Sequence, residues 1–170
     1  IYGMAGLVLE LLAAGKTDGV EVEIVPGITA AVMAASVLGA PLMNDFCIIS
    51  LSDLLTPAAV IRKRLAAAAA GDFVICLYNP RSHTRTKPLD DALAILRSLL
   101  SPDTVVGIVR NAGRNGQSQW IGTLETVEPE QVDMFCVMIV GNSATRVLDG
   151  RMVTARGYEK TGGEKGYGRP

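Results

Sequence analysis

The most regular pattern of hydrophobic and polar positions lies at residues 20–36. Residues 20–25 alternate between aliphatic side chains and glutamates, which predicts a strand with one buried face. Pro26-Gly27 ends this strand, because proline lacks a ladder donor and glycine allows a close backbone approach. A helix of small residues then begins near Thr29, and its first turn leaves N–H groups free. This sequence predicts a slot where a ligand could lie against the backbone, although an ordinary strand-to-helix turn has the same pattern.

Strands and helices alternate along the rest of the chain. Apolar residues at spacings of three and four, together with prolines at helix starts, predict helices at residues 4–12, 57–70, 88–100 and 129–132. Continuous apolar runs, expected where helices cover both faces of a sheet, predict strands at residues 45–51, 73–78, 105–109, 120–124 and 135–140. The alternation predicts an α/β fold whose sheet is largely parallel.

Polar residues and glycines gather where the predicted strands end. They stand at Pro26-Gly27, Tyr78-Asn79-Pro80, Asn111-Ala112-Gly113 and Gly141-Asn142. Ligands of open α/β sheets bind at the carboxyl ends of the strands. We therefore expect these segments to meet at one edge of the sheet and to form a ligand site there.

Composition and charge exclude several classes of function. The chain of 170 residues is 49% hydrophobic, which is enough to bury a core, and its net charge of −1 argues against a nucleic-acid binder held by bulk charge. No apolar run approaches the length of a bilayer, so no membrane segment is expected. Cys47, Cys76 and Cys136 lie in apolar strands without metal-ligand spacing, which indicates free thiols in a reducing cytoplasm and no metal site.

The chemistry that remains is that of arginines and backbone groups. The chain has no P-loop, no Gly-x-Gly-x-x-Gly after a strand and no nucleophile elbow, and its only histidine, His83, lies in a loop. Two loops at the predicted edge carry Arg81, Arg85, Arg110 and Arg114. Guanidinium groups suit carboxylates or phosphates, so the loops favour a small polyanionic substrate, although each arginine alone is also typical of a solvated loop. Such a site would act by positioning two reactants, as in a transfer reaction.

Several blocks of the chain resemble the tetrapyrrole methylase family. The blocks are Ile1–Glu10, Val25–Ala31, Leu77–Ser82, Gly107–Arg114, Ile139–Ser143 and Gly150–Thr154, in the family's order. The resemblance implies two α/β domains with S-adenosylmethionine bound in the cleft between them. It further implies methyl transfer to C17 of precorrin-3B or its cobalt form, with ring contraction, in cobalamin biosynthesis, by a homodimer.

The resemblance also assigns residues to roles. By match to the family's motifs, the residues that contact S-adenosylmethionine are expected to be Thr29, Ala30, Tyr78, Ala112, Gly141 and Asn142. Arg81 and Arg114 are expected to bind carboxylates of the corrinoid precursor. No residue is assigned as a general base.

The resemblance predicts a domain organisation as well. Residues 1–43 are expected to be the last part of a truncated N-terminal α/β domain, 44–158 a C-terminal α/β domain and 159–170 a flexible tail. The family's N-terminal strand and its Gly-Asp-Pro-Gly turn do not precede Ile1 here, so we expect this chain alone to bind S-adenosylmethionine weakly or not at all and to be incomplete for activity. Two alternatives stay open: a family member with another target carbon, and a non-catalytic α/β module that forms oligomer contacts.

Overall fold

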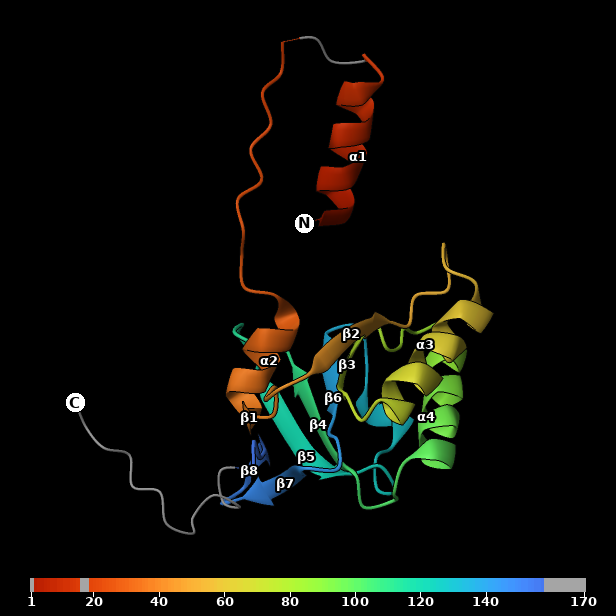
Figure 1. Cartoon of the computed structure of the whole chain (residues 1–170), viewed down its shortest axis with the longest axis vertical. Coiled ribbons are helices and arrows are strands. Elements are labelled where there is room, and N and C mark those ends of the chain that lie inside the picture. The colour runs from red at the N-terminus through yellow and green to blue at the C-terminus, as the bar shows by residue number, and fades with distance from the viewer. Residues whose placement is uncertain (1, 16–18, 158–170) are drawn as a thin grey trace, which may run out of the picture.

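A five-stranded sheet lies between one helix and a pair of helices in the computed structural model, which describes residues 2–15 and 19–157 (Figure 1). One face is covered by α2 (Ala30–Leu38), and the other by α3 (Ala58–Ala70) and α4 (Lys87–Leu99). The α/β class is therefore confirmed. The tail predicted at 159–170 lies outside the described residues. The domain boundary between residues 43 and 44 stays a prediction, and α2 packs on the sheet that follows it.

The sheet is mixed rather than largely parallel. Its strands stand in the order β2 (Phe46–Ser50), β3 (Val74–Tyr78), β6 (Cys136–Val140), β4 (Val105–Arg110) and β5 (Ser118–Thr123). Only β2 and β3 pair in parallel, while β6 pairs antiparallel with both β3 and β4. The expectation of a largely parallel sheet was wrong because β5 follows β4 through a short loop and β6 enters between β3 and β4 in the opposite direction. The carboxyl ends of β2, β3 and β4 still share one edge.

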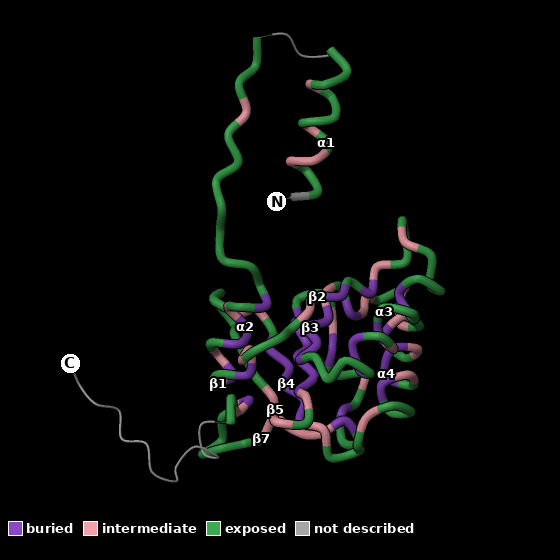
Figure 2. Tube along the Cα trace, in the orientation of Figure 1, coloured by how far each residue is buried: buried purple, intermediate pink, exposed green. Residues whose placement is uncertain are grey.

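The central strands are largely buried (Figure 2), and their alternate side chains face two separate cores. Toward α2, the buried strand residues Val74, Cys76, Val109, Val137 and Ile139 meet Ala31, Ala34 and Leu38. Toward α3 and α4, the buried strand residues Ile75, Leu77, Ile108 and Met138 meet Leu65, Leu89, Leu93 and Leu96. This period-two division between two apolar layers explains why β3 and β6 are hydrophobic without interruption.

Gly107 allows α2 to lie close to the sheet. A methyl group on Gly107 would stand 2.5 Å from Cδ1 of Leu38 and 3.1 Å from the sulfur of Met152. Leu38 and Met152 are both buried, so neither can move into solvent. A glycine inside a strand therefore marks a close approach, and this one sets the height of α2 above β4.

A small second sheet joins the early and late parts of the chain. Its strands are β1 (Gly39–Ala40), β8 (Arg151–Thr154) and β7 (Thr145–Leu148), with β1 parallel to β8 and β7 antiparallel to it. The buried hydroxyl of Thr154 donates to the carbonyl of Pro41 at 2.7 Å. The sequence did not predict these short strands. The short helix η1 (Pro129–Gln131) lies where one was predicted.

Two expectations for strands were wrong. Residues 20–25 form no strand, and all of them except the half-buried Val22 are exposed. A strand needs a neighbour for its N–H and C=O groups, and none pairs with this segment within the described part of the chain.

The expectation that helices cover both faces of β2 was also wrong. In β2, Phe46 and Ile48 are 39% and 44% exposed, because β2 is an edge strand that α2 does not cover. The predicted N-terminal helix is confirmed as α1 (Tyr2–Ala13). Both α1 and residues 20–25 lie apart from the sheet (Figure 1).

Candidate functional site

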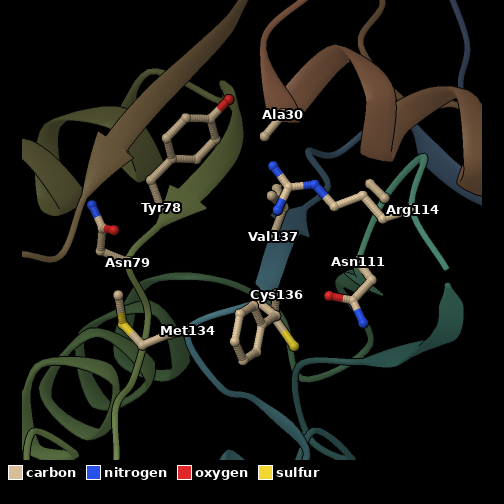
Figure 3. Close-up of a pocket in the computed structure, with 10 residues that line it drawn as sticks. Ala30, Tyr78, Asn79, Asn111, Arg114, Met134, Cys136 and Val137 are labelled. Carbon is tan, nitrogen blue, oxygen red and sulfur yellow. The ribbon is translucent and has the colours of Figure 1, made fainter. Parts of the chain in front are cut away.

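A cavity of about 230 Å³ opens where β3 and β4 end. It is lined from four sides by Ala30 of α2, by Tyr78 and Asn79 after β3, by Asn111, Ala112 and Arg114 after β4, and by Met134, Phe135, Cys136 and Val137 at the start of β6. Figure 3 shows these side chains facing a common space. Because β6 runs against β3 and β4, its amino end meets their carboxyl ends and forms the floor.

Five of the residues expected to bind ligands come together at this cavity. Ala30, Tyr78, Ala112 and Arg114 line it, although they come from segments far apart in the sequence. Thr29 stands beside them through its hydrogen bond to the Tyr78 hydroxyl, 2.5 Å long. The structure thus places the start of α2 and the ends of β3 and β4 against one cavity, whereas Pro26-Gly27, the other side of the expected slot, does not line it.

Gly141 and Asn142 lie at the opposite edge of the sheet. The antiparallel direction of β6 carries its carboxyl end away from the ends of β3 and β4. There the Asn142 amide donates to the carbonyl of Asp72, which precedes β3, at 3.1 Å. The expectation that all strand-end segments share one edge was therefore wrong for these two residues, since it assumed a parallel β6.

Tyr78 links the end of β3 to the start of α2 by hydrogen bonds. Its phenolic oxygen accepts the N–H of Ala31 at 2.6 Å and shares a hydrogen bond with the Thr29 hydroxyl. The Thr29 side chain makes no capping bond to its own helix. The hydroxyl of a residue on β3 therefore satisfies an N–H group at the start of α2 that would otherwise lack a partner.

Two asparagines that were not assigned a role shape the cavity. Asn79 and Asn111 each follow the last residue of a strand, and each has a φ of 51°. Asparagine adopts this left-handed conformation more readily than most residues, and such positions gather at functional sites. The Asn79 amide also donates to the Ser50 hydroxyl at 3.0 Å, which joins the ends of β2 and β3. An asparagine after each of two buried strands was the signal in the sequence.

Asp133 organises the floor of the cavity. Its carboxylate accepts from Nε of Arg110 at 2.9 Å, from the Phe135 N–H at 2.9 Å and from the Cys136 thiol at 3.3 Å. Burial tends to raise the pKa of Asp133, but these hydrogen bonds outweigh it and the pKa is lowered. The Arg110 guanidinium also lies 5.5 Å from the centre of the Phe135 ring. Sequence reasoning missed this network because Arg110, at the end of β4, is far in the sequence from Asp133, Phe135 and Cys136 around the start of β6.

Of the four arginines that were predicted to lie in loops, two hold parts of the protein together and two stand at the cavities. Arg110 holds Asp133, and Arg85 donates to the carbonyls of Leu51 and Asn79, so these two stabilise loops. Arg81 pairs with the exposed Glu130 at 3.3 Å in an adjoining cavity of about 340 Å³, which shares Met134 and Phe135 with the first. Arg114 is exposed and makes no ion pair with any residue the structure describes; its guanidinium reaches over the cavity (Figure 3).

The cysteines are free thiols, as predicted. Cys76 and Cys136 are buried, and Cys47 is half-buried. Burial is the main cause that raises the pKa of Cys76 to about 12 and that of Cys136 to about 11, so the thiol at the floor of the cavity stays protonated at neutral pH. Within residues 2–15 and 19–157, no group of three or more His, Cys, Asp or Glu side chains is placed to hold a metal ion. In the same residues, no helix has both the length and the apolar character needed to cross a membrane.

The fold is that of a known class. The family of Tetrapyrrole (Corrin/Porphyrin) Methylases matches residues 1–128, and the chain belongs to this family. The resemblance seen in the sequence blocks is thus confirmed.

Individual relatives narrow the comparison. A Salmonella typhimurium protein, described as a probable cobalt-factor III C(17)-methyltransferase, is 56% identical over 158 residues, which cover 93% of this chain and 65% of that protein. A Sinorhizobium precorrin-3B C(17)-methyltransferase is 40% identical over 151 residues, which cover 88% of this chain and 59% of that protein. The chain therefore spans 65% and 59% of the length of these relatives.

Solved structures agree with this placement. The crystal structure of the methyltransferase CobJ matches with a TM-score of 0.83 at 40% identity, over 89% of this chain and 63% of that chain. A uroporphyrin-III C-methyltransferase from Thermus thermophilus, complexed with S-adenosyl homocysteine, matches with a TM-score of 0.53 at 23% identity, over 83% of this chain and 60% of that chain. At that identity the second likeness shows the shared fold alone.

Proposed function

We propose that the protein is an S-adenosylmethionine-dependent methyltransferase that methylates C17 of precorrin-3B or its cobalt form, with ring contraction, in cobalamin biosynthesis. The observation that carries the proposal is the 56% identity, over 93% of this chain, to a relative described as a cobalt-factor III C(17)-methyltransferase. The likeness to the methyltransferase CobJ, with a TM-score of 0.83, supports the methyltransferase part of the proposal. We further propose a cytoplasmic homodimer.

The lining of the cavity suits part of S-adenosylmethionine. Ala30 and Ala112 add little bulk, Tyr78 offers an aromatic ring, and Asn79 and Asn111 offer amides. Such a mixture of small apolar, aromatic and amide groups matches a nucleoside joined to a charged amino acid. The volume of about 230 Å³ lies below the roughly 300–1,000 Å³ of whole ligand sites, so the cavity would hold only part of the molecule. Thr29, Ala30, Tyr78 and Ala112 are our proposed contacts.

The arginines at the rim are the proposed contacts of the substrate. A corrinoid precursor carries several carboxylates, and guanidinium groups bind carboxylates through paired hydrogen bonds. Arg114 is available, because it has no ion-pair partner in the part of the chain that the structure describes. Arg81 would exchange Glu130, whose carboxylate is largely exposed, for a carboxylate of the substrate. Because the Arg81 side chain is only 20% exposed, this exchange matters in that it keeps the guanidinium paired with a carboxylate.

The chain's own contribution to the reaction is to position the reactants and exclude water. S-adenosylmethionine, when bound, supplies a methyl group on a positively charged sulfur. The walls from α2 and β3 orient that molecule, and the rim arginines hold the macrocycle beside it. Cys136 takes no part as a nucleophile, because its thiol is protonated at neutral pH.

Turnover by the intact protein tests the proposal. The protein is incubated with methyl-labelled S-adenosylmethionine and either precorrin-3B or cobalt-factor III, and the labelled carbon is identified by NMR. Label at C17 of a ring-contracted product is the expected result. Label at another carbon would show a different tetrapyrrole methylase, and absence of transfer to either substrate would contradict the proposal.

A matched pair of variants tests the site. Ala112→Leu narrows the cavity, and we expect it to weaken binding of S-adenosyl homocysteine at least tenfold by calorimetry. Ala94→Leu makes the same change on an exposed position of α4 and is expected to leave the affinity unchanged. Equal affinities of the two variants would show that the cavity is not the binding site.

A further inference from the structure

The start of α2 depends on a residue from another element. An N-cap threonine normally uses its own hydroxyl to accept an N–H group of the first turn, but the Thr29 side chain makes no such bond. The Tyr78 hydroxyl takes this place, since it accepts the Ala31 N–H at 2.6 Å and hydrogen-bonds to the Thr29 hydroxyl at 2.5 Å. These bonds join segments 47 and 49 residues apart in the sequence.

We propose that Tyr78 is a positioning residue, whose hydroxyl fixes the Thr29–Ala31 segment as one wall of the cavity. Ala30 lies between the two residues that Tyr78 holds, and it lines the cavity directly. The packing of α2 on the sheet, which includes the fully buried Ala31, is apolar and lacks the direction that a hydrogen bond has. The two hydrogen bonds supply that direction. Tyr78 therefore acts through its hydroxyl, besides any contact that its ring makes.

The same geometry leaves one hydroxyl hydrogen of the Tyr78–Thr29 pair without an acceptor beside the cavity. Tyr78 and Thr29 have one hydroxyl hydrogen each, and one of the two is used in the bond between them. The other hydrogen has no acceptor among the residues that the structure describes. Tyr78 lines the cavity and Thr29 precedes Ala30 at its rim, so the pair presents one O–H donor to an acceptor on a bound molecule.

Amide hydrogen exchange tests the positioning role without any ligand. In Tyr78→Phe the ring remains and the hydroxyl is lost, so the Ala31 amide should exchange about tenfold faster, while the Ala35 amide inside α2 stays protected. Ser98→Ala, which removes a hydroxyl on α4, serves as the control and should leave both rates unchanged. An unchanged Ala31 rate in Tyr78→Phe would overturn the inference.

A second test rests on the proposed function and measures affinity for S-adenosyl homocysteine. We expect Tyr78→Phe to weaken binding roughly three- to tenfold. We expect it to raise KM for S-adenosylmethionine with kcat within about twofold. Because the hydroxyls act as a pair, Tyr78→Phe combined with Thr29→Val should be no weaker than the worse single variant. These affinities are measured on the intact protein. Wild-type affinity in Tyr78→Phe would show that only ring packing matters. Absence of binding by the intact wild-type protein would contradict the proposed function and leave the exchange test to decide the inference.

Discussion

Gly107 provides the sharpest test of how α2 is seated. A methyl group there would lie 2.5 Å and 2.9 Å from the two terminal carbons of Leu38 and 3.1 Å from the sulfur of Met152. Ordinary carbon contacts lie at about 3.5–4.0 Å, so Leu38 must move by about 1 Å in a closed core. Overpacking of this kind costs roughly 1–3 kcal/mol, and the lower chain entropy of alanine returns about 0.5–1 kcal/mol. Gly107→Ala should therefore lower the free energy of unfolding by about 1–2 kcal/mol.

The sign of this effect should reverse when Leu38 is shortened. Leu38→Ala alone removes a buried side chain and should cost about 2–5 kcal/mol. In that background the methyl group of Gly107→Ala enters the space that Leu38 has left, so it should raise stability. Urea unfolding of the wild type, the two single variants and the double variant measures the coupling.

A glycine with open surroundings is the control. Gly6 lies in α1, and a methyl group there meets no atom within 4 Å. Gly6→Ala should leave the midpoint of the main unfolding transition unchanged or slightly raised, since alanine favours helix. An equal loss of stability from Gly107→Ala with and without Leu38 would refute the close-approach argument.

Three further predictions follow from the cavity and its floor. Because the pKa of Asp133 is lower in the folded protein than in the unfolded chain, where it is about 3.9, the ionised carboxylate stabilises the fold above that pH. This stabilisation is lost as the pH falls through the pKa of Asp133 in the folded protein. Asp133→Asn should therefore flatten the pH dependence of the free energy of unfolding below about pH 4. Asn111→Ala should cost about 1 kcal/mol in thermal unfolding because of its φ of 51°, whereas Asn111→Gly should cost less. A thiol reagent should label Cys47 before the buried Cys76 and Cys136, as mass spectrometry of partly labelled protein can show.

The sequence predicted the elements well but not the direction of every strand. Hydrophobic patterns located α2, β3, β4 and β6, because buried segments carry continuous or periodic apolar residues. Nothing local in Cys136–Val140 tells whether β6 runs parallel or antiparallel to its neighbours, since an apolar strand buried on both faces reads alike in either direction. That ambiguity placed Gly141 and Asn142 at the wrong edge and hid residues 134–137, which form the floor of the cavity.

The side-chain networks were beyond sequence reasoning for a similar reason. Arg85 and Arg110 resemble Arg81 and Arg114 as loop cations, and only the fold shows that the first two hold carbonyls and Asp133. Residues 20–25 have the alternation of apolar and polar side chains that is typical of a half-buried strand. Such a segment forms a strand only where its backbone can hydrogen-bond to a neighbouring strand. The hydrophobic and polar pattern therefore predicted the helix start and the strand ends that line the cavity. The floor of the cavity and its hydrogen bonds are seen only in the structure.

We propose that S-adenosylmethionine binds where the start of α2 meets the ends of β3 and β4. A crystal structure of the intact protein with S-adenosyl homocysteine tests this most directly. We expect ligand density against Ala30, the Tyr78 ring and Ala112, with the Tyr78 hydroxyl still hydrogen-bonded to α2. Ligand density confined to the opposite edge of the sheet, beside Asn142, would contradict it.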